Sequence, residues 1–158
     1  MENLVGQTLL NKYYLREIIG HGGTSDVYLA WDKLRASELA VKVLNRKLVG
    51  ESRFLGMFKK EAEFMKKLSH DNVVPLYDFG QDNRKGEKIV FIVMKYIKGM
   101  NLRRLIDERK NKGQFLGLFE VSQILTAVCK ALFFAHRSKV LHGDIKAANI
   151  LIAYGENS

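Results

Sequence analysis

Residues 13–31, YYLREIIGHGGTSDVYLAW, contain two candidate strands on either side of a glycine-rich segment. The first run leads into HGGTS. In the second run, DVYLAW, apolar and polar residues alternate, which is typical of a strand with one buried face. A third run, ELAVKVL at 38–44, alternates in the same way after a polar turn. We therefore predict that the fold begins with an antiparallel meander of three strands.

The stretch up to residue 97 adds one helix and two strands. In RFLGMFKKEAEFMKKL, residues 53–68, apolar side chains recur at helical spacing. The runs DNVVPLYDFG (71–80) and EKIVFIVMKYI (87–97) predict two apolar strands, joined by the polar turn QDNRKG (81–86). Residues 1–97 are therefore expected to form an α+β domain with a five-stranded antiparallel sheet and one helix.

The pattern changes to helix after residue 98, close to Gly99. One long amphipathic helix is predicted from apolar residues at alternating steps of three and four, namely Leu118, Val121, Leu125, Val128, Leu132 and Ala135. The runs KVLH (139–142) and NILIAY (149–154) are expected to form short strands on either side of the segment HGDIKAANIL (142–151). We therefore expect a second domain over residues 98–158.

The composition is that of a folded protein, with 158 residues, of which 47% are hydrophobic and 27% charged. Its single cysteine, Cys129, excludes an internal disulfide and a cysteine zinc cluster, and favours a cytoplasmic location. The formal charge of +9 permits an acidic partner, but the basic residues form scattered pairs, so nucleic-acid binding is not expected. No membrane segment is expected either, because Glu120 and Lys130 interrupt the most apolar stretch, residues 116–135.

Two charged residues lie where apolar ones are expected. Lys42 interrupts an apolar face of its strand, and Glu61 lies on the buried stripe of its helix. Because an unpaired buried charge is costly, the two are predicted to pair with each other. The glycines of GHGGTSDV (20–27) would let backbone N–H groups approach a phosphate. A simple hairpin turn and a lysine that reaches solvent at a sheet edge are the alternatives without a ligand.

The segment HGDIKAANIL concentrates side chains that can do chemistry. Asp144 can accept a proton, Lys146 can offset negative charge, and Asn149 offers a neutral oxygen to a hard cation. A turn capped by Asp144 and Asn149 is the structural alternative. His136 and His142 lack a third candidate ligand nearby, so they are not expected to bind a metal.

The order of these features resembles a eukaryotic-like protein kinase domain. The stretches IGHGGTSDVYLAWD (19–32), LAVKVL (39–44) and VMKYIKGMNL (93–102) are most similar to those of the bacterial serine/threonine kinases. The resemblance implies a kinase N-lobe with a glycine-rich loop and hinge at 1–97. It also implies an incomplete, helical C-lobe at 98–158 that ends before the Asp-Phe-Gly motif of the family. ATP and Mg²⁺ would be the cofactors, and a protein serine or threonine the substrate.

Carried over by position, the resemblance implies three groups of site residues. Asp144 would be the catalytic aspartate that accepts the substrate hydroxyl proton, and Lys146 the lysine near the γ-phosphate. Asn149 would be a magnesium ligand. The nucleotide would be bound by Gly20, His21, Gly22, Gly23, Ser25, Val27, Ala40, Lys42, Glu61, Met94, Lys95 and Ile97.

The sequence also departs from the family pattern. Gly143 stands where an arginine is usual, which argues against control through a phosphate that docks on that arginine. Because no Asp-Phe-Gly segment follows Asn149, we expect these 158 residues to be part of a kinase domain and to transfer phosphate poorly alone. A second polypeptide that completes the C-lobe is then a candidate partner. An inactive nucleotide-binding or scaffold module and a basic nucleic-acid-binding module remain as alternatives.

Overall fold

The structure, a computed structural model, describes residues 3–84 and 86–154. The chain divides into two compact units. The first unit comprises Met1–Lys67 and Val74–Tyr96, and the second comprises Leu68–Val73 and Ile97–Ser158. In the described residues, each unit contains one antiparallel sheet.

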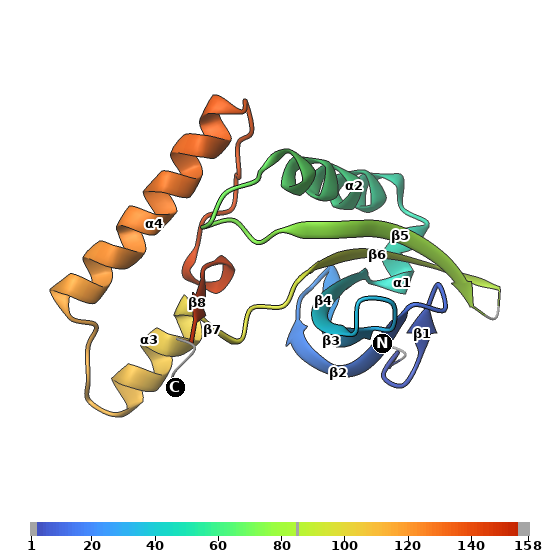
Figure 1. Ribbon diagram of the computed structural model, residues 1–158, viewed down its shortest axis with the longest axis horizontal. Helices are drawn as coiled ribbons and strands as arrows, with labels where there is room; N and C mark the ends of the chain where they lie inside the picture. Colours follow the sequence, from blue (N-terminus) through green and yellow to red (C-terminus); the bar gives the residue numbers. More distant parts are fainter. Residues whose placement is uncertain (1–2, 85, 155–158) are drawn as a thin grey trace. The chain divides into compact units, whose positions relative to one another are not determined.

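A six-stranded antiparallel sheet forms the first unit, with the strand order β1-β2-β3-β4-β6-β5 (Figure 1). The first four strands are sequence neighbours that pair in order, and β2, β3 and β4 form the predicted three-stranded meander. Strand β6 then pairs with β4, and β5 takes the edge. The strands are β1 (Thr8–Leu9), β2 (Tyr13–His21), β3 (Ser25–Asp32), β4 (Ser37–Leu44), β5 (Leu76–Arg84) and β6 (Glu87–Lys95).

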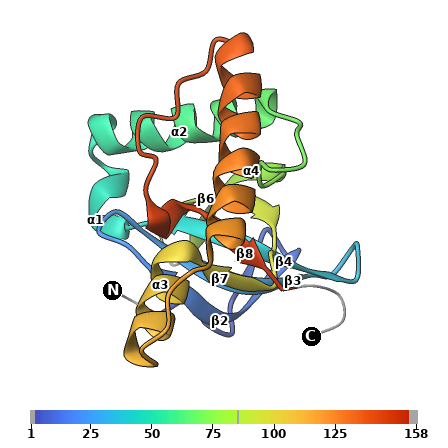
Figure 2. The same ribbon diagram turned by 90° about the vertical axis from the view of Figure 1, so that its left-hand side faces the viewer.

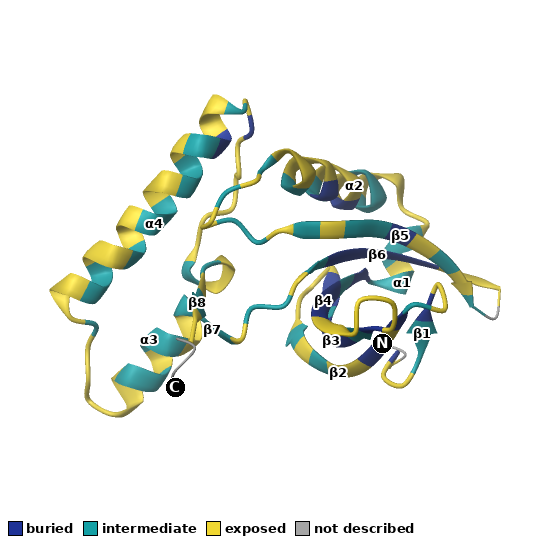
Figure 3. Ribbon diagram, viewed as in Figure 1, coloured by how far each residue is buried: buried dark blue, intermediate teal, exposed yellow. Residues whose placement is uncertain are grey.

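Side chains that alternate along the strands give this sheet two apolar faces. On β4, Leu39, Val41 and Val43 belong to one buried cluster, whereas Leu44 belongs to the other. Strand β6 contributes to both clusters, and its residues from Ile89 to Val93 are fully buried (Figure 3). A near-continuous apolar run is what a strand covered on both faces requires.

Two helices follow β4 in the first unit, α1 (Arg46–Val49) and α2 (Ser52–Lys67). Asn45 caps α1, because its side-chain oxygen accepts a hydrogen bond of 3.1 Å from the Lys47 N–H. On α2, Phe58 and Ala62 are four residues apart, so they face the same side and are buried in the second apolar cluster. The sheet therefore has one face that α2 covers through a short apolar stripe.

The second unit contains two α-helices and a two-stranded sheet (Figures 1 and 2). Strands β7 and β8 lie side by side, with Met100 opposite Ile152. Gly99 is required at this position, because a Cβ would collide with the carbonyl oxygen of Ile152. The elements are β7 (Gly99–Asn101), α3 (Leu102–Asn111), α4 (Leu118–Arg137), the 3₁₀ turn η1 (Ala147–Asn149) and β8 (Leu151–Ala153).

The long helix predicted from the apolar steps is α4. It begins after Gly117, whose N–H donates to Glu120 Oε2 at 2.9 Å. In the described part of the chain, Ala135 is the only buried residue of α4 (Figure 3), and the large side chains of Leu118, Phe119, Leu125 and Phe133 are exposed.

Helix α4 is also long and apolar enough to cross a membrane by length and composition, with a mean hydropathy of 1.6. The core helix of a soluble protein meets the same criteria. A single helix of this kind is weak support for a membrane role, so we assign none.

Four expectations about the two units are wrong in detail. The first unit has two helices and not one, because Asn45 caps the short helix α1 before α2 begins. The first sheet has six strands and not five, because β1 pairs with β2 and buries Leu9. Residues 81–84 are not part of a turn, since β5 continues to Arg84 and pairs there with Glu87. Polar residues are tolerated because β5 is an edge strand. Residues 139–142 form no strand, and the described partner of β8 is β7.

The segment Leu68–Val73 belongs to the second unit, although it precedes β5 in the sequence. The ring of His70 lies 5.4 Å from the ring of Phe134 on α4, centroid to centroid. Along the sequence, the first unit ends at Tyr96 and the second continues from Ile97, but the second unit also includes Leu68–Val73. The expected domain boundary between residues 97 and 98 stays a prediction.

Gly80 on β5 offers a test of the packing of the first unit. A Cβ at this position would lie 2.5 Å from the ring of Phe91, so Gly80→Ala is expected to destabilise the fold by about 1–3 kcal/mol through overpacking. The measurement is the free energy of unfolding in urea. Gly56→Ala on α2 is the control: nothing lies within 4 Å of its Cβ, and alanine favours a helix by up to ~1 kcal/mol. Equal stability of the two variants would contradict the described packing.

Candidate functional site

The glycine-rich segment forms the tip of the hairpin between β2 and β3. The Gly22 N–H donates to the Ser25 carbonyl oxygen at 2.9 Å, and a Cβ on Gly22 would lie 3.0 Å from that oxygen. The N–H groups of Gly23 and Thr24 make no hydrogen bond within the described residues. The tip therefore presents two adjacent N–H groups that can bind water or an anion.

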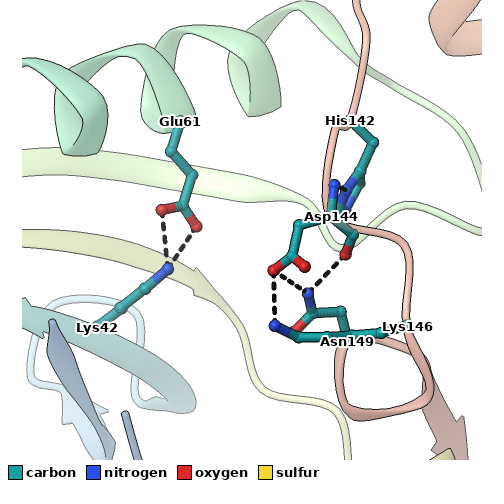
Figure 4. A network of polar contacts seen from close by, with 6 residues as sticks. All are labelled: Lys42, Glu61, His142, Asp144, Lys146 and Asn149. Atoms are coloured by element: carbon teal, nitrogen blue, oxygen red, sulfur yellow. Dashed lines mark hydrogen bonds and ion pairs between the residues drawn. The ribbon is translucent and has the colours of Figure 1, made fainter. Parts of the chain in front are cut away.

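The predicted pair of Lys42 and Glu61 is present in the first unit (Figure 4). Lys42 Nζ donates to both carboxylate oxygens of Glu61, at 2.6 Å and 2.8 Å. The Lys42 side chain is 23% exposed and that of Glu61 is 42% exposed, and Nζ also lies 5.8 Å from the ring centroid of Phe58. A two-oxygen contact of this kind fixes where the ammonium group points, because both acceptors must be met at once.

Strand register places further candidate residues beside Lys42. Val27 is the partner of Lys42 on β3, and Ala40 is the partner of Met94 on β6. The Lys95 N–H donates to the Pro75 carbonyl oxygen at 3.0 Å. Any contact that the Lys95 backbone makes with a ligand must therefore use its carbonyl oxygen.

The segment HGDIKAANIL brings three predicted residues together in the second unit (Figure 4). Lys146 Nζ lies 2.9 Å from Asp144 Oδ2. Asn149 Nδ2 donates to the Asp144 carbonyl oxygen at 2.8 Å and to Oδ2 at 3.0 Å. The turn η1 makes this possible, because it returns the chain so that Asn149 lies against Asp144.

Asp144 is exposed and held in its ionised form. The Lys146 ammonium group, and then the Asn149 amide, hold the pKa of the Asp144 carboxyl below its usual range. The backbone N–H of Asp144 donates to His142 Nδ1 at 3.2 Å. Asp144 can therefore accept a hydrogen bond from a hydroxyl group near neutral pH.

Gly143 has a φ of +75°, a left-handed conformation that glycine adopts without strain. Nothing lies within 4 Å of its Cβ position, so space does not select glycine there. The backbone conformation does, and it turns the chain between His142 and Asp144.

The residues predicted from sequence fall into the two units. The first unit contains Lys42, Glu61 and the candidate nucleotide residues from Gly20 to Lys95, and the second contains Ile97 and the Asp144 segment. Sequence reasoning did not single out Asp26, which is buried and pairs with His21. The burial of Asp26 is hard to predict from sequence, because a charged residue at the second position of a strand is usually exposed to solvent.

Metal-binding capacity is limited in the described residues. They contain no group of three His, Cys, Asp or Glu side chains that could hold a metal ion. Asn149 offers one neutral oxygen, and Asp144 already contacts Lys146. Mg²⁺ usually binds through one or two protein groups together with phosphates and water, so these residues fit it only as part of a shared shell.

Comparison with known proteins gives a consistent result. The family described as Protein kinase domain matches residues 13–157. The chain is 37% identical to a probable serine/threonine-protein kinase, PknB, of Corynebacterium glutamicum over 144 residues, which are 91% of this chain and 22% of that protein. It is 33% identical to the serine/threonine-protein kinase PrkC of Bacillus subtilis over 154 residues, which are 98% of this chain and 22% of that protein.

Solved structures agree. The kinase domain of Mycobacterium tuberculosis PknI superposes with a TM-score of 0.78 at 27% identity, covering 97% of this chain and 60% of that chain. A double mutant of the same domain gives a TM-score of 0.82, covering 99% and 59%. The chain therefore belongs to the protein kinase family, and it has the kinase-like α+β fold expected from its sequence. It spans 22% of the length of these two serine/threonine kinase relatives.

The tripeptide Asp78-Phe79-Gly80 has the letters of the kinase magnesium motif, but it lies in β5 of the first unit. Phe79 packs against Phe58, with 6.4 Å between ring centroids. Asp78 Oδ2 accepts a hydrogen bond of 2.7 Å from the Tyr13 hydroxyl. These residues hold the sheet together, and their place before Asp144 in the chain excludes them as the motif that follows the catalytic loop.

The Lys42–Glu61 pair can be tested by its coupling energy. Lys42→Met, Glu61→Gln and the double variant form a cycle, and the coupling is expected to be about 0.5–2 kcal/mol in the free energy of unfolding. The control cycle uses Arg16 and Glu38, which are 2.9 Å apart with side chains 40% and 45% exposed. Its coupling is expected to be no more than about 0.5 kcal/mol. A Lys42–Glu61 coupling below that of the control would rule out a defined pair.

Proposed function

We propose that this chain supplies the nucleotide-binding and catalytic-loop residues of a serine/threonine protein kinase, which transfers the γ-phosphoryl group of ATP to a protein hydroxyl. The observation that carries the proposal is the Lys42 ammonium group held by both oxygens of Glu61, in a chain of the protein kinase family. The named relatives PknB and PrkC are serine/threonine kinases, which favours that substrate class. A cytoplasmic location belongs to the same proposal and is supported by the single cysteine.

The first unit would bind ATP. The free N–H groups at the Gly23–Thr24 tip suit phosphate oxygens, and Lys42 is an oriented positive charge for the α- and β-phosphates. Gly20 and Gly22 would keep the loop narrow, with Ser25 and His21 at its ends. Val27, Ala40 and Met94 would contact the base as apolar neighbours, and Lys95 would meet its polar edge through its backbone. The Ile97 backbone, which belongs to the second unit, is proposed to meet the same edge.

The second unit would act on the hydroxyl group. Asp144, kept ionised by Lys146 and Asn149, would accept the hydrogen bond of the substrate hydroxyl and orient it for attack. Lys146 would also offset negative charge on the transferred phosphoryl group. When bound, Mg²⁺ would neutralise the phosphates, and Asn149 is the residue of this chain that would hold it.

Binding and transfer are separable in this proposal. The residues that would bind ATP lie within 1–97, whereas Asn149 is the one metal ligand that we assign within 1–158. We propose that the 158-residue chain alone binds ATP but transfers its γ-phosphoryl group poorly. A nucleotide-binding scaffold without transfer is the second candidate function. A longer protein that carries these residues and still lacks transfer would favour it.

Lys42 is the first residue to test for nucleotide binding. Lys42→Met removes a charged donor to the phosphates, so the Kd for ATP is expected to rise about tenfold to a hundredfold. The measurement is a fluorescence or calorimetric titration with ATP. Lys47→Met on α1 is the matched control, because its side chain is exposed and it lies outside the site; its Kd should equal that of the wild type. Equal Kd values for the two variants would count against an ATP site at Lys42.

Asp144 is the residue to test for phosphoryl transfer. Asp144→Asn keeps the size of the side chain but removes its charge, so kcat should fall by about 10²–10⁴ with little change in the Kd for ATP. The assay uses the kinase purified from the cells that naturally produce it. It measures the incorporation of labelled γ-phosphate into a generic protein substrate and then identifies phosphoserine and phosphothreonine. Asp107→Asn, which alters an exposed ion pair on α3, is the control. Undiminished transfer by the Asp144 variant would overturn the assignment.

A further inference from the structure

Two residues flank the glycine-rich tip and contact each other. His21 is the last residue of β2, Asp26 is the second residue of β3, and the two are direct partners in the ladder. His21 Nδ1 lies 3.0 Å from Asp26 Oδ1. The His21 side chain is 72% exposed, whereas that of Asp26 is 5% exposed.

A buried carboxyl group needs a partner, because leaving it unsatisfied costs its lost hydration. In the described residues, His21 is the only side chain that makes a hydrogen bond or ion pair with Asp26. Asp26 therefore depends on this contact more than His21 does. His21 remains hydrated without Asp26, but Asp26 loses its one side-chain partner without His21.

The pair lies on the face of the hairpin that does not carry Lys42. Side chains alternate along β3, so Asp26 shares a face with Tyr28, which belongs to the first apolar cluster. The charge of Asp26 adds to burial in raising the pKa of the Tyr28 hydroxyl, which agrees with this placement. Val27 points to the opposite face, where its ladder partner is Lys42.

We propose that His21 and Asp26 are positioning residues that set the glycine-rich tip for the phosphates, so that His21 acts through the tip and not by the direct nucleotide contact that the resemblance implies. The inference rests on the proposed ATP site and deepens it. Across the tip the Gly22 N–H donates to the Ser25 carbonyl oxygen, and the Asn45 N–H donates to the Thr24 carbonyl oxygen at 2.8 Å. Neither bond uses the N–H groups of Gly23 and Thr24, and two adjacent glycines make the segment costly to order. A side-chain contact at the base of the tip limits the conformations of the Gly23 and Thr24 N–H groups.

The test compares His21→Ala with His21→Asn. Alanine removes the donor, whereas the asparagine amide can still donate to Asp26 Oδ1. In His21→Ala, without nucleotide, amide hydrogen exchange at Gly22, whose N–H donates to the Ser25 carbonyl oxygen, is expected to accelerate about tenfold. Its Kd for ATP should rise about threefold to tenfold, because a smaller fraction of molecules has the tip in place. His21→Asn should restore both values. Arg16→Ala, which breaks an exposed ion pair between β2 and β4, is the control and should change neither.

The outcomes separate this inference from the proposed function. Faster exchange with an unchanged Kd in His21→Ala would overturn the positioning role and leave the ATP site intact. Unchanged exchange in His21→Ala, or no restoration by His21→Asn, would also overturn it. A wild-type protein that does not bind ATP would overturn the proposed function and this inference together. Asp26→Ala gives a second view of the pair, because it removes the acceptor for His21 Nδ1, and its change in exchange at Gly22 should match that of His21→Ala.

Discussion

The first unit depends on how it accommodates one positive charge on an apolar face of its sheet. Lys42 shares that face with Leu44, so its ammonium group needs a partner above the sheet. Helix α2 supplies Glu61, on the side that also buries Phe58 and Ala62. The apolar stripe sets which side of the helix faces the sheet, and the ion pair sets the direction of the lysine. Stability and a candidate phosphate contact therefore use the same packing interface.

Glycine meets more than one physical requirement in this structure. At Gly80 a side chain would overlap Phe91, and at Gly99 it would meet the carbonyl of Ile152, so both are packing requirements. Gly143 has room but a left-handed backbone, which turns the chain into the Asp144 segment. At the hairpin tip, the pair of His21 and Asp26 offsets the freedom that the adjacent glycines introduce. The same residue type therefore serves both packing and chain reversal.

The sequence predicts most of the first sheet because its strands alternate and follow each other as local neighbours. Prediction from sequence is less successful where a strand forms only because it pairs with another strand. Strand β1 has two residues and no periodic signal, and it forms because β2 offers an edge. Residues 81–84 look like a turn, yet they extend β5 because an edge strand can keep polar side chains in water. Residues 139–142 are apolar enough for a strand, but they have no neighbouring strand to pair with.

The sequence by itself predicted the pairing of Lys42 with Glu61 from local periodicity, and the clustering of Asp144, Lys146 and Asn149 from close spacing. The kinase family was recognised from the resemblance of several motifs in order, and the family match confirms it. Only the tertiary structure decided the burial of Asp26 and its pairing with His21. It also showed that the Lys95 N–H is already used by Pro75, and that Asp78, Phe79 and Gly80 serve the core. Burial and hydrogen-bond partners depend on residues far apart in the chain, so no short stretch of sequence contains that information.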